Sequence, residues 1–144
     1  MIDHKNKVRV RACGLLIEED SLLLVELYSP VSNELIWTAP GGGVEFGESL
    51  EETVTREFKE ETGIKVKTLK LIHINELING DFHAIEFYYL VEKISGTLKL
   101  GVDPEYKSGE QILKNIAYLK KEEIQKLNVS PKYLKDDLWK DLKF

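Results

Sequence analysis

Alternating hydrophobic and polar positions divide most of this chain into strand-like segments. Period-two patterning and β-branched residues mark five of them: Val8–Ile17, Leu22–Tyr28, Ile36–Thr38, Lys67–Leu77 and Phe82–Lys93. Asn79-Gly80 lies between the last two, and this dipeptide is typical of a tight hairpin turn. A further strand is expected near Ile116–Leu119. The pattern therefore predicts a sheet that contains at least one hairpin.

Residues 49–63 change to a helical pattern. Ser49 followed by Glu52 forms the sequence signature of a capping box, and Gly63 stands where a left-handed helix end belongs. The apolar stripe of this helix is Leu50, Val54 and Phe58. Just upstream, the segment Pro40–Gly43 predicts a glycine turn, which lets the backbone approach a ligand closely.

The C-terminal part predicts two more helices. Glu122–Leu127 suggests a short one, and Ser130-Pro131 is expected to begin a longer one. The second helix would carry one apolar face: Leu134, Leu138 and Leu142. Strands and helices together give an α+β alternation without internal repeats, but periodicity alone does not fix the order of strands in the sheet.

The helix at 49–63 carries charges that its local structure disfavours. Glu57 shares one face with Glu60 and Glu61, and each like-charge pair at this spacing costs a few tenths of a kcal/mol. Carboxylates near a helix C-terminus also oppose the helix dipole. Arg56 lies four residues before Glu60 and can fix that carboxylate by an ion pair. Several broken rules in one place indicate a functional site, and a divalent cation is the simplest remedy for converging carboxylates.

Composition limits the class of protein. The 144 residues are 42% hydrophobic and 31% charged, which fits one domain over residues 1–144 with a proper core. The first residues lack an apolar run, and no stretch reaches eighteen apolar residues, so we expect a cytoplasmic protein without a membrane segment. A net charge of −5 makes nucleic acid an unfavourable partner. The single cysteine, Cys13, is expected to be buried and inert rather than reactive.

The segment Gly42–Ile64 resembles the signature box of the Nudix hydrolases. That signature is Gly, five residues, Glu, seven residues, Arg-Glu, a bulky apolar residue, any residue, Glu-Glu, any residue, Gly and a bulky apolar residue. Every position is met here: Gly42, Glu48, Arg56, Glu57, Phe58, Glu60, Glu61, Gly63 and Ile64. The resemblance is close over these 23 residues and looser elsewhere. It implies an α/β/α sandwich with a mixed sheet.

The resemblance also implies a metal site and its residues. Glu57 and Glu61 would bind the metal directly, Glu60 would be a ligand or act from just behind, and the carbonyl of Gly42 would be a further ligand. Arg56 would orient the carboxylates, and Glu48 would support the site through water. Mg²⁺ is the expected ion, with Mn²⁺ as the alternative, because Mg²⁺ prefers oxygen ligands and bridges carboxylates to phosphates.

Other residues are candidates on weaker grounds. For substrate binding they are Arg11, Trp37, Gly41 and Gly43. Arg11 is equally expected to pair with surface acids, and a strand tryptophan usually packs in or beside a core. His73 and His83 lack partners at ligand spacing and are taken as ordinary strand residues. Glu110 is the favoured catalytic base, with Glu105 in reserve, because a loop carboxylate outside the metal shell accepts a proton better than a metal ligand does. If neither acts, the base role returns to a box glutamate such as Glu60.

Two classes of function are consistent with these residues. The first is a metal-dependent hydrolase that cleaves the diphosphate of a nucleoside diphosphate derivative: ADP-ribose, a nucleotide sugar or a modified nucleoside triphosphate. The alternative is a non-catalytic nucleotide-binding regulator, for which lost box glutamates are expected, and none is lost here. Diphosphate isomerase chemistry ranks last, because it usually accompanies a departed box. The expected partner is a small-molecule nucleotide, and a homodimer is a further expectation because dimers are common among similar proteins.

Overall fold

The computed structural model describes residues 6–29, 32–101 and 113–142. Its elements, in chain order, are β1 (Val8–Glu18), β2 (Ser21–Ser29), β3 (Glu34–Thr38), β4 (Gly41–Gly43), α1 (Leu50–Thr62), β5 (Ile64–Asn79), β6 (Phe82–Gly96), β7 (Leu113–Lys120), α2 (Lys121–Gln125), the 3-10 turn η1 (Lys132–Leu134) and α3 (Asp137–Asp141). The predicted strands are all present, and most extend a few residues beyond their predicted ends.

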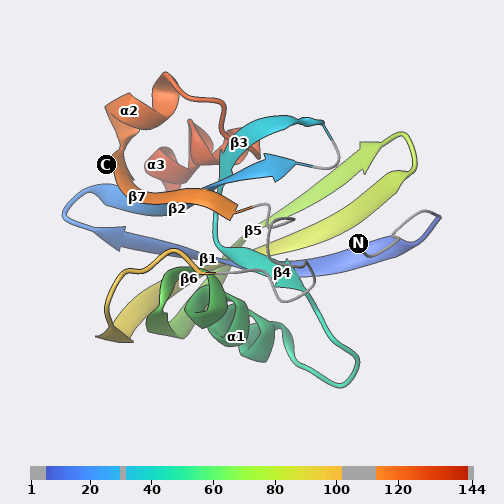
Figure 1. The fold of residues 1–144 in the computed structure, drawn as a ribbon, viewed down its shortest axis with the longest axis horizontal. Coiled ribbons are helices and arrows are strands. Elements are labelled where there is room, and N and C mark those ends of the chain that lie inside the picture. The colour runs from blue at the N-terminus through green and yellow to red at the C-terminus, as the bar shows by residue number, and fades with distance from the viewer. Residues whose placement is uncertain (1–5, 30–31, 102–112, 143–144) are drawn as a thin grey trace.

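The strands form one mixed sheet of seven strands. Its main path runs β3-β2-β1-β6-β5, with β4 paired to β1 and β7 paired to β2. β1 and β6 are parallel, while the other pairs are antiparallel. In Figure 1, α1 lies on one side of the sheet and α2, η1 and α3 lie on the other. This arrangement confirms the expected α+β fold with a mixed sheet between helical layers.

Alternation along β1 supplies a core on each face of the sheet. Ala12 and Leu16 point to α1 and pack with its buried Val54 and Phe58. Gly14 lies on the same face, where an added Cβ would come within 2.8 Å of a ring carbon of Phe58, so only glycine lets the helix approach this closely. The opposite positions of β1, among them Cys13, join the core beneath the C-terminal segments.

Two elements differ from the sequence expectation. The glycine turn is in fact a short strand, β4, because Gly41–Gly43 pairs with Arg11–Cys13 of β1. The prediction of a single C-terminal helix is wrong. Two shorter elements, η1 and α3, replace it, and Leu142 follows the last residue of α3. Short helices have little stability of their own, and here the path follows buried side chains: Leu134, Leu138 and Trp139.

Several smaller expectations are confirmed. The hairpin turn lies between β5 and β6, and Gly80 within it has a φ of 59°. Cys13 is buried, and burial raises the pKa of its thiol to about 12, so the thiol stays protonated near neutral pH. Among the described residues, no helix is long and apolar enough to span a bilayer.

Candidate metal and phosphate site

Helix α1 is held firmly at both ends, and this fixes the side chains that it carries. Ser49 Oγ accepts from the backbone N–H of Glu52 at 3.0 Å, while the Glu52 carboxylate accepts from the N–H of Ser49 at 2.9 Å. At the other end Gly63 has a φ of 78° and donates its N–H to the Lys59 carbonyl. The capping box and the left-handed end predicted from the sequence are both present.

Glu57 and Glu61 meet the glycine strand β4. An added Cβ on Gly42 would lie 2.4 Å from the carboxyl carbon of Glu57, so the carboxylate occupies the space that a side chain would need. Glu61 is buried, and its Oε1 accepts from the N–H of Gly41 at 3.2 Å. Gly42 is therefore required for the Glu57 carboxylate to lie against the backbone, whereas Gly41 is required by its contact with β1, where a Cβ would lie 2.5 Å from the Ala12 carbonyl oxygen.

The pair is electrostatically strained without a cation. Burial raises the pKa of Glu61 well above its ordinary value, and the charge of Glu57 and a hydrogen bond with Glu57 raise it further. The N–H of Gly41 opposes this rise but does not cancel it. Adjacent buried carboxylates need either a shared proton or a positive ion between them. The donor set therefore fits a hard divalent cation, which prefers carboxylate and carbonyl oxygens.

Arg56 binds the carboxylates around this pair. Its Nε and Nη2 donate to the two oxygens of Glu48 at 2.7 and 3.0 Å, a bidentate arrangement. Its Nη1 donates to Glu57 at 2.9 Å and to Glu60 at 3.4 Å, and its Nη2 also reaches the Gly43 carbonyl at 3.2 Å. The hydrogen bonds from Arg56 lower the pKa of Glu48 to about 2, although burial opposes the shift. Arg56 thus orients Glu57, as an ion pair at this position should.

The three box carboxylates do not all converge. Among the residues that the structure describes, no group of three or more histidine, cysteine or acidic side chains is placed to hold a metal ion. Glu57 and Glu61 lie together, whereas the Glu60 carboxylate lies toward Arg56 and is partly exposed. The two-carboxylate pair is thus the part of the candidate metal site that this conformation assembles. Glu105 and Glu110, the candidate general bases, lie outside the described residues.

Arg11 has a partner that sequence reasoning missed. It forms an ion pair with Glu86, which lies directly opposite it on the parallel strand β6. Glu86 is buried and also accepts from Asn75 at 3.0 Å and from the Tyr88 hydroxyl at 3.3 Å. Burial works against the charge of Arg11, but the acidic groups around it together raise the pKa of the guanidinium; they are Cys13, Glu86, Tyr88 and Glu61. The available signal was one acidic residue in the apolar run of β6, since a buried charge needs a partner.

Trp37 lies four residues before β4 in the chain, and Arg9 lies two residues before Arg11 on β1. Trp37 is half-buried against the core beneath the C-terminal segments, and its backbone pairs with Asn128 and Ser130. The guanidinium of Arg9 lies 3.3 Å from where a Cβ of Gly43 would stand. Arg9 was not among the expected site residues, although its alternation with Arg11 places it on the same face of β1.

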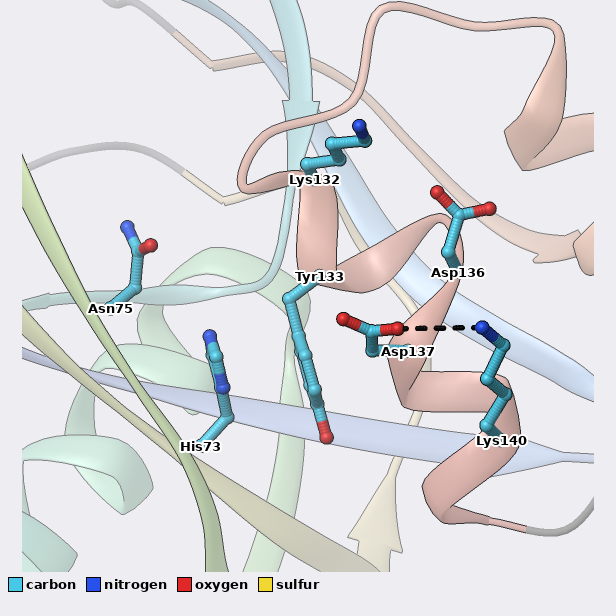
Figure 2. A pocket seen from close by; sticks show the side chains of 7 residues that line it. All are labelled: His73, Asn75, Lys132, Tyr133, Asp136, Asp137 and Lys140. Carbon is cyan, nitrogen blue, oxygen red and sulfur yellow. Dashed lines mark ion pairs between the residues drawn. The ribbon is translucent and has the colours of Figure 1, made fainter.

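A pocket of about 510 Å³ opens on the sheet face opposite α1. Figure 2 shows His73 and Asn75 of β5 on one side and the C-terminal segment on the other, which contributes Lys132, Tyr133, Asp136, Asp137 and Lys140. The rings of His73 and Tyr133 stack with centroids 3.7 Å apart and planes 2° apart. Burial lowers the pKa of His73, which favours the neutral ring. No sequence signal identified this pocket, because its two sides are about sixty residues apart in the chain.

Comparison with known proteins agrees with this geometry. The family model described as NUDIX domain matches residues 6–137. An ADP-ribose pyrophosphatase of Methanocaldococcus jannaschii is 37% identical over 90 residues, which are 61% of this chain and 53% of that protein. A probable DHNTP pyrophosphohydrolase of Lactococcus lactis is 37% identical over 94 residues, 59% of this chain and 54% of that protein.

The fold itself also has solved counterparts. A NUDIX hydrolase from Nitrosomonas europaea superposes with a TM-score of 0.74 at 22% identity, covering 95% of this chain and 89% of that one. This likeness concerns the fold alone. The chain spans about half the length of the curated relatives that it matches. Because the family model covers nearly all of the described structure, the chain belongs to the Nudix domain family.

Proposed function

We propose that this protein is a Mg²⁺-dependent hydrolase that cleaves the diphosphate linkage of a nucleoside diphosphate joined to another group. The observation that carries the proposal is the pair of Glu57, which is partly buried, and Glu61, which is buried, against Gly41 and Gly42 on a helix capped at both ends. Nudix hydrolases generally use divalent metal ions, and the two relatives above are named as pyrophosphatases. Mn²⁺ is the alternative ion.

The roles of the residues follow from their contacts. Glu57 and Glu61 would hold the cation, together with the carbonyl of Gly42, and Glu60 would join them or act from behind. When bound, the cation neutralises diphosphate charge and lowers the pKa of a water that attacks phosphorus. Arg56 keeps Glu57 in place and, through its bidentate pair with Glu48, keeps the loop before α1 near the site.

The backbone of β4 is suited to the phosphates. Gly43 is partly exposed and has no side chain, which would allow close approach of an anion beside the Arg9 guanidinium, whereas Gly41 is buried against β1 and would act only through the backbone. Arg11 pairs with Gly43 in the β1–β4 register, so the Arg11 side chain extends from the strand next to β4. The half-buried Trp37 would border the site rather than stack fully on a base.

The pocket of Figure 2 would hold the part of the substrate beyond the diphosphate. Asn75 lines it and donates to Glu86, which pairs with Arg11, so three side chains connect the pocket with the strand beside β4. The stacked rings of His73 and Tyr133 offer an aromatic wall for a planar group. ADP-ribose, nucleotide sugars and modified nucleoside triphosphates all share a planar base and a diphosphate, so the choice among them depends on this pocket and the nearby loops.

One experiment tests the reaction directly. The full chain is incubated in ¹⁸O-labelled water with a panel of nucleoside diphosphate derivatives and with Mg²⁺, Mn²⁺ or EDTA. The products are separated by chromatography and their masses are determined by mass spectrometry. We expect a nucleoside monophosphate and a second phosphorylated product, with the label on a phosphate of one of them. Label on a sugar carbon, or turnover that persists in EDTA, would exclude the mechanism.

The alternative is a non-catalytic regulator that binds nucleotides on the same fold. It predicts that a nucleotide raises the melting temperature while no substrate in the panel is consumed. All carboxylates of the Nudix box are present in this chain, which argues against a regulator, because their mutual repulsion destabilises α1 unless a cation binds them. The cytoplasmic location and the single domain over residues 1–144 remain predictions.

A further inference from the structure

Glu86 is a buried carboxylate to which the proposed reaction gives no role. Among the described residues, the only buried side chains that carry a charge are Glu61 and Glu86. Glu61 belongs to the candidate metal site. Glu86 lies on β6, two residues before Tyr88, which packs in the core on the sheet face opposite α1. A buried ion pair gives little net stability compared with a well-packed apolar pair, so a charge at this position indicates a further role.

The pairing registers place Glu86 in a row of residues that crosses four strands. Gly43 of β4 pairs with Arg11 of β1, and Arg11 pairs with Glu86 of β6. Glu86 pairs in turn with Asn75 of β5, which lines the pocket of Figure 2. Residues paired across strands have their side chains on one face of the sheet. The row therefore runs from the glycine strand, which borders the candidate metal site, to the pocket.

The Glu86 carboxylate is fixed through both of its oxygens. Oε2 accepts from Nη1 of Arg11. Oε1 accepts from Nδ2 of Asn75 at 3.0 Å and from the hydroxyl of Tyr88 at 3.3 Å. Because the carboxylate is buried, turning it away from any of these donors would leave polar groups unsatisfied where water is scarce. Glu86 therefore holds the Arg11 guanidinium in one direction, with Asn75 and Tyr88 as its braces.

Arg11 has donors left for an anion and lies near the candidate metal site. A guanidinium has five N–H donors, and among the described residues only Nη1 of Arg11 has a hydrogen-bond partner. The Arg11 side chain is 19% exposed, so part of it reaches the surface. Its charge also acts on Glu61, where it opposes the rise in the pKa of that carboxyl. A diphosphate on the metal site would therefore lie within electrostatic reach of Arg11.

We propose that Glu86 is a positioning residue, which holds the Arg11 guanidinium in the direction that a phosphate of the bound diphosphate requires. The proposal rests on the diphosphate hydrolase function proposed above. An arginine that is already oriented loses little conformational freedom when the substrate binds, and this increases affinity. Binding of this kind acts on the substrate and the transition state alike, so Glu86 should affect KM rather than kcat.

Binding of a non-hydrolysable diphosphate tests this role without turnover. The probes are methylenediphosphonate and the α,β-methylene analogue of ADP, each measured by calorimetry with Mg²⁺ and the full chain. In Glu86→Gln the side-chain oxygen can still accept from Arg11, but the ion pair is lost. We expect the Kd of both probes to rise about tenfold, the weight of one charge-assisted hydrogen bond, and the affinity for Mg²⁺ alone to stay the same. Glu76→Gln is the matched control, because Glu76 follows Asn75 on β5 but pairs with His83, and it should change neither affinity.

A double-variant comparison tests whether Glu86 acts through Arg11. Arg11→Lys keeps the positive charge beside Glu86 but replaces the planar fork of donors by one flexible ammonium group. This variant alone should also weaken probe binding about tenfold. In its background, Glu86→Gln should add less than about threefold, since there is no guanidinium left to orient. Additive losses would mean that Glu86 acts independently of Arg11 and would overturn the proposal.

Steady-state kinetics supplies a readout that a purely structural role would not change. On the best substrate of the panel, Glu86→Gln should raise KM about tenfold and leave kcat within about threefold. If no member of the panel is consumed, the proposed hydrolase function fails, while the binding data still test Glu86. Unchanged probe affinity in folded Glu86→Gln, or no binding of either probe by the wild type, would overturn the positioning role.

Circular dichroism verifies that each variant is folded. If Glu86→Gln is unfolded, Glu86→Asp takes its place in every measurement, because it keeps the charge and withdraws the carboxylate from Arg11 by one methylene group. The expected losses of probe affinity are the same. If neither variant folds, Glu86 serves the stability of the core, and the proposal is overturned.

Discussion

Glu61→Gln separates the catalytic and structural consequences of one buried charge. Glutamine has the shape of glutamate, so its oxygen can still accept from the N–H of Gly41, and its amide can donate to Glu57. The substitution therefore removes a charge without opening a cavity. Without metal, we expect the free energy of unfolding near neutral pH to rise by about 1–3 kcal/mol. Burial and the charge of Glu57 raise the pKa of Glu61, and a raised pKa costs the folded state about 1.4 kcal/mol for each pH unit above the ordinary pKa, a cost that the neutral amide does not have. Turnover should fall about 10²-fold or more, because an anionic metal ligand is lost.

Two assays on the same samples measure these effects. In thermal unfolding of a domain of this size, 1 kcal/mol corresponds to a shift of about 3–5 °C, so the metal-free variant should melt at a higher temperature than the wild type. Mg²⁺ should raise the melting temperature of the wild type by preferential binding to the folded state, and should raise that of the variant much less. Steady-state kinetics on the best substrate of the panel gives kcat.

Glu51→Gln is the matched control, because Glu51 is exposed on the first turn of the same helix. It should leave kcat and the response to Mg²⁺ unchanged. The reasoning is refuted if Glu61→Gln keeps more than about a tenth of the wild-type kcat. It is also refuted if the metal-free variant is less stable than the wild type while its fold is intact.

Three further predictions concern the same site. Gly42→Ala would place a Cβ 2.4 Å from the Glu57 carboxyl carbon and displace it, so Mg²⁺ affinity measured by calorimetry should fall at least tenfold, and unchanged affinity would contradict this. Arg56 lowers the pKa of Glu48 from 4.5 to about 2, so this group stabilises the fold fully above pH 4.5 and loses its contribution as the pH falls toward 2. The free energy of unfolding, measured with urea, should therefore fall less on acidification for Glu48→Gln than for the wild type. Glu110→Gln should lower kcat about 10²-fold with little change in metal affinity, whereas loss of metal binding would make Glu110 a ligand.

Elements with local signals were predictable from the sequence. The ends of α1 depend on Ser49 with Glu52 and on Gly63, and each signal acts within one helical turn. The turn between β5 and β6 depends on Asn79-Gly80 in the same way. The glycine strand β4 was missed, because three glycines have no strand propensity, and only their pairing with β1 makes them extended.

The C-terminal segment shows the opposite limitation. Leu134, Leu138 and Leu142 are spaced as on one continuous helix, and the pattern alone supports that interpretation. In the structure the chain breaks into η1 and α3, and the indole N–H of Trp139 donates to the Leu134 carbonyl at 2.9 Å. Tertiary contacts therefore override a weak local preference, as is common for helices too short to be stable alone.

The candidate site likewise contains residues that local spacing predicted and residues that only tertiary structure brings together. Glu57 and Glu61 are one helical turn apart, so their common face followed from the sequence. The ion pair of Arg11 with Glu86 did not, because the two residues are 75 positions apart and meet only through the parallel register of β1 and β6. Arg11 and Glu86 each stand out in the sequence as a charged residue within an apolar strand, and buried charges require partners.

The pairing of Arg11 also limits what it can do for a substrate. A guanidinium has five N–H donors, and Glu86 accepts from Nη1. Nε of Arg11 is buried and has no hydrogen-bond partner among the described residues. Arg11 can therefore contact a phosphate only if it retains Glu86 at the same time, because releasing it would leave a buried carboxylate unpaired at a cost of several kcal/mol. A phosphate contact by Arg11 is thus an addition to its pair with Glu86, and the structural role comes first.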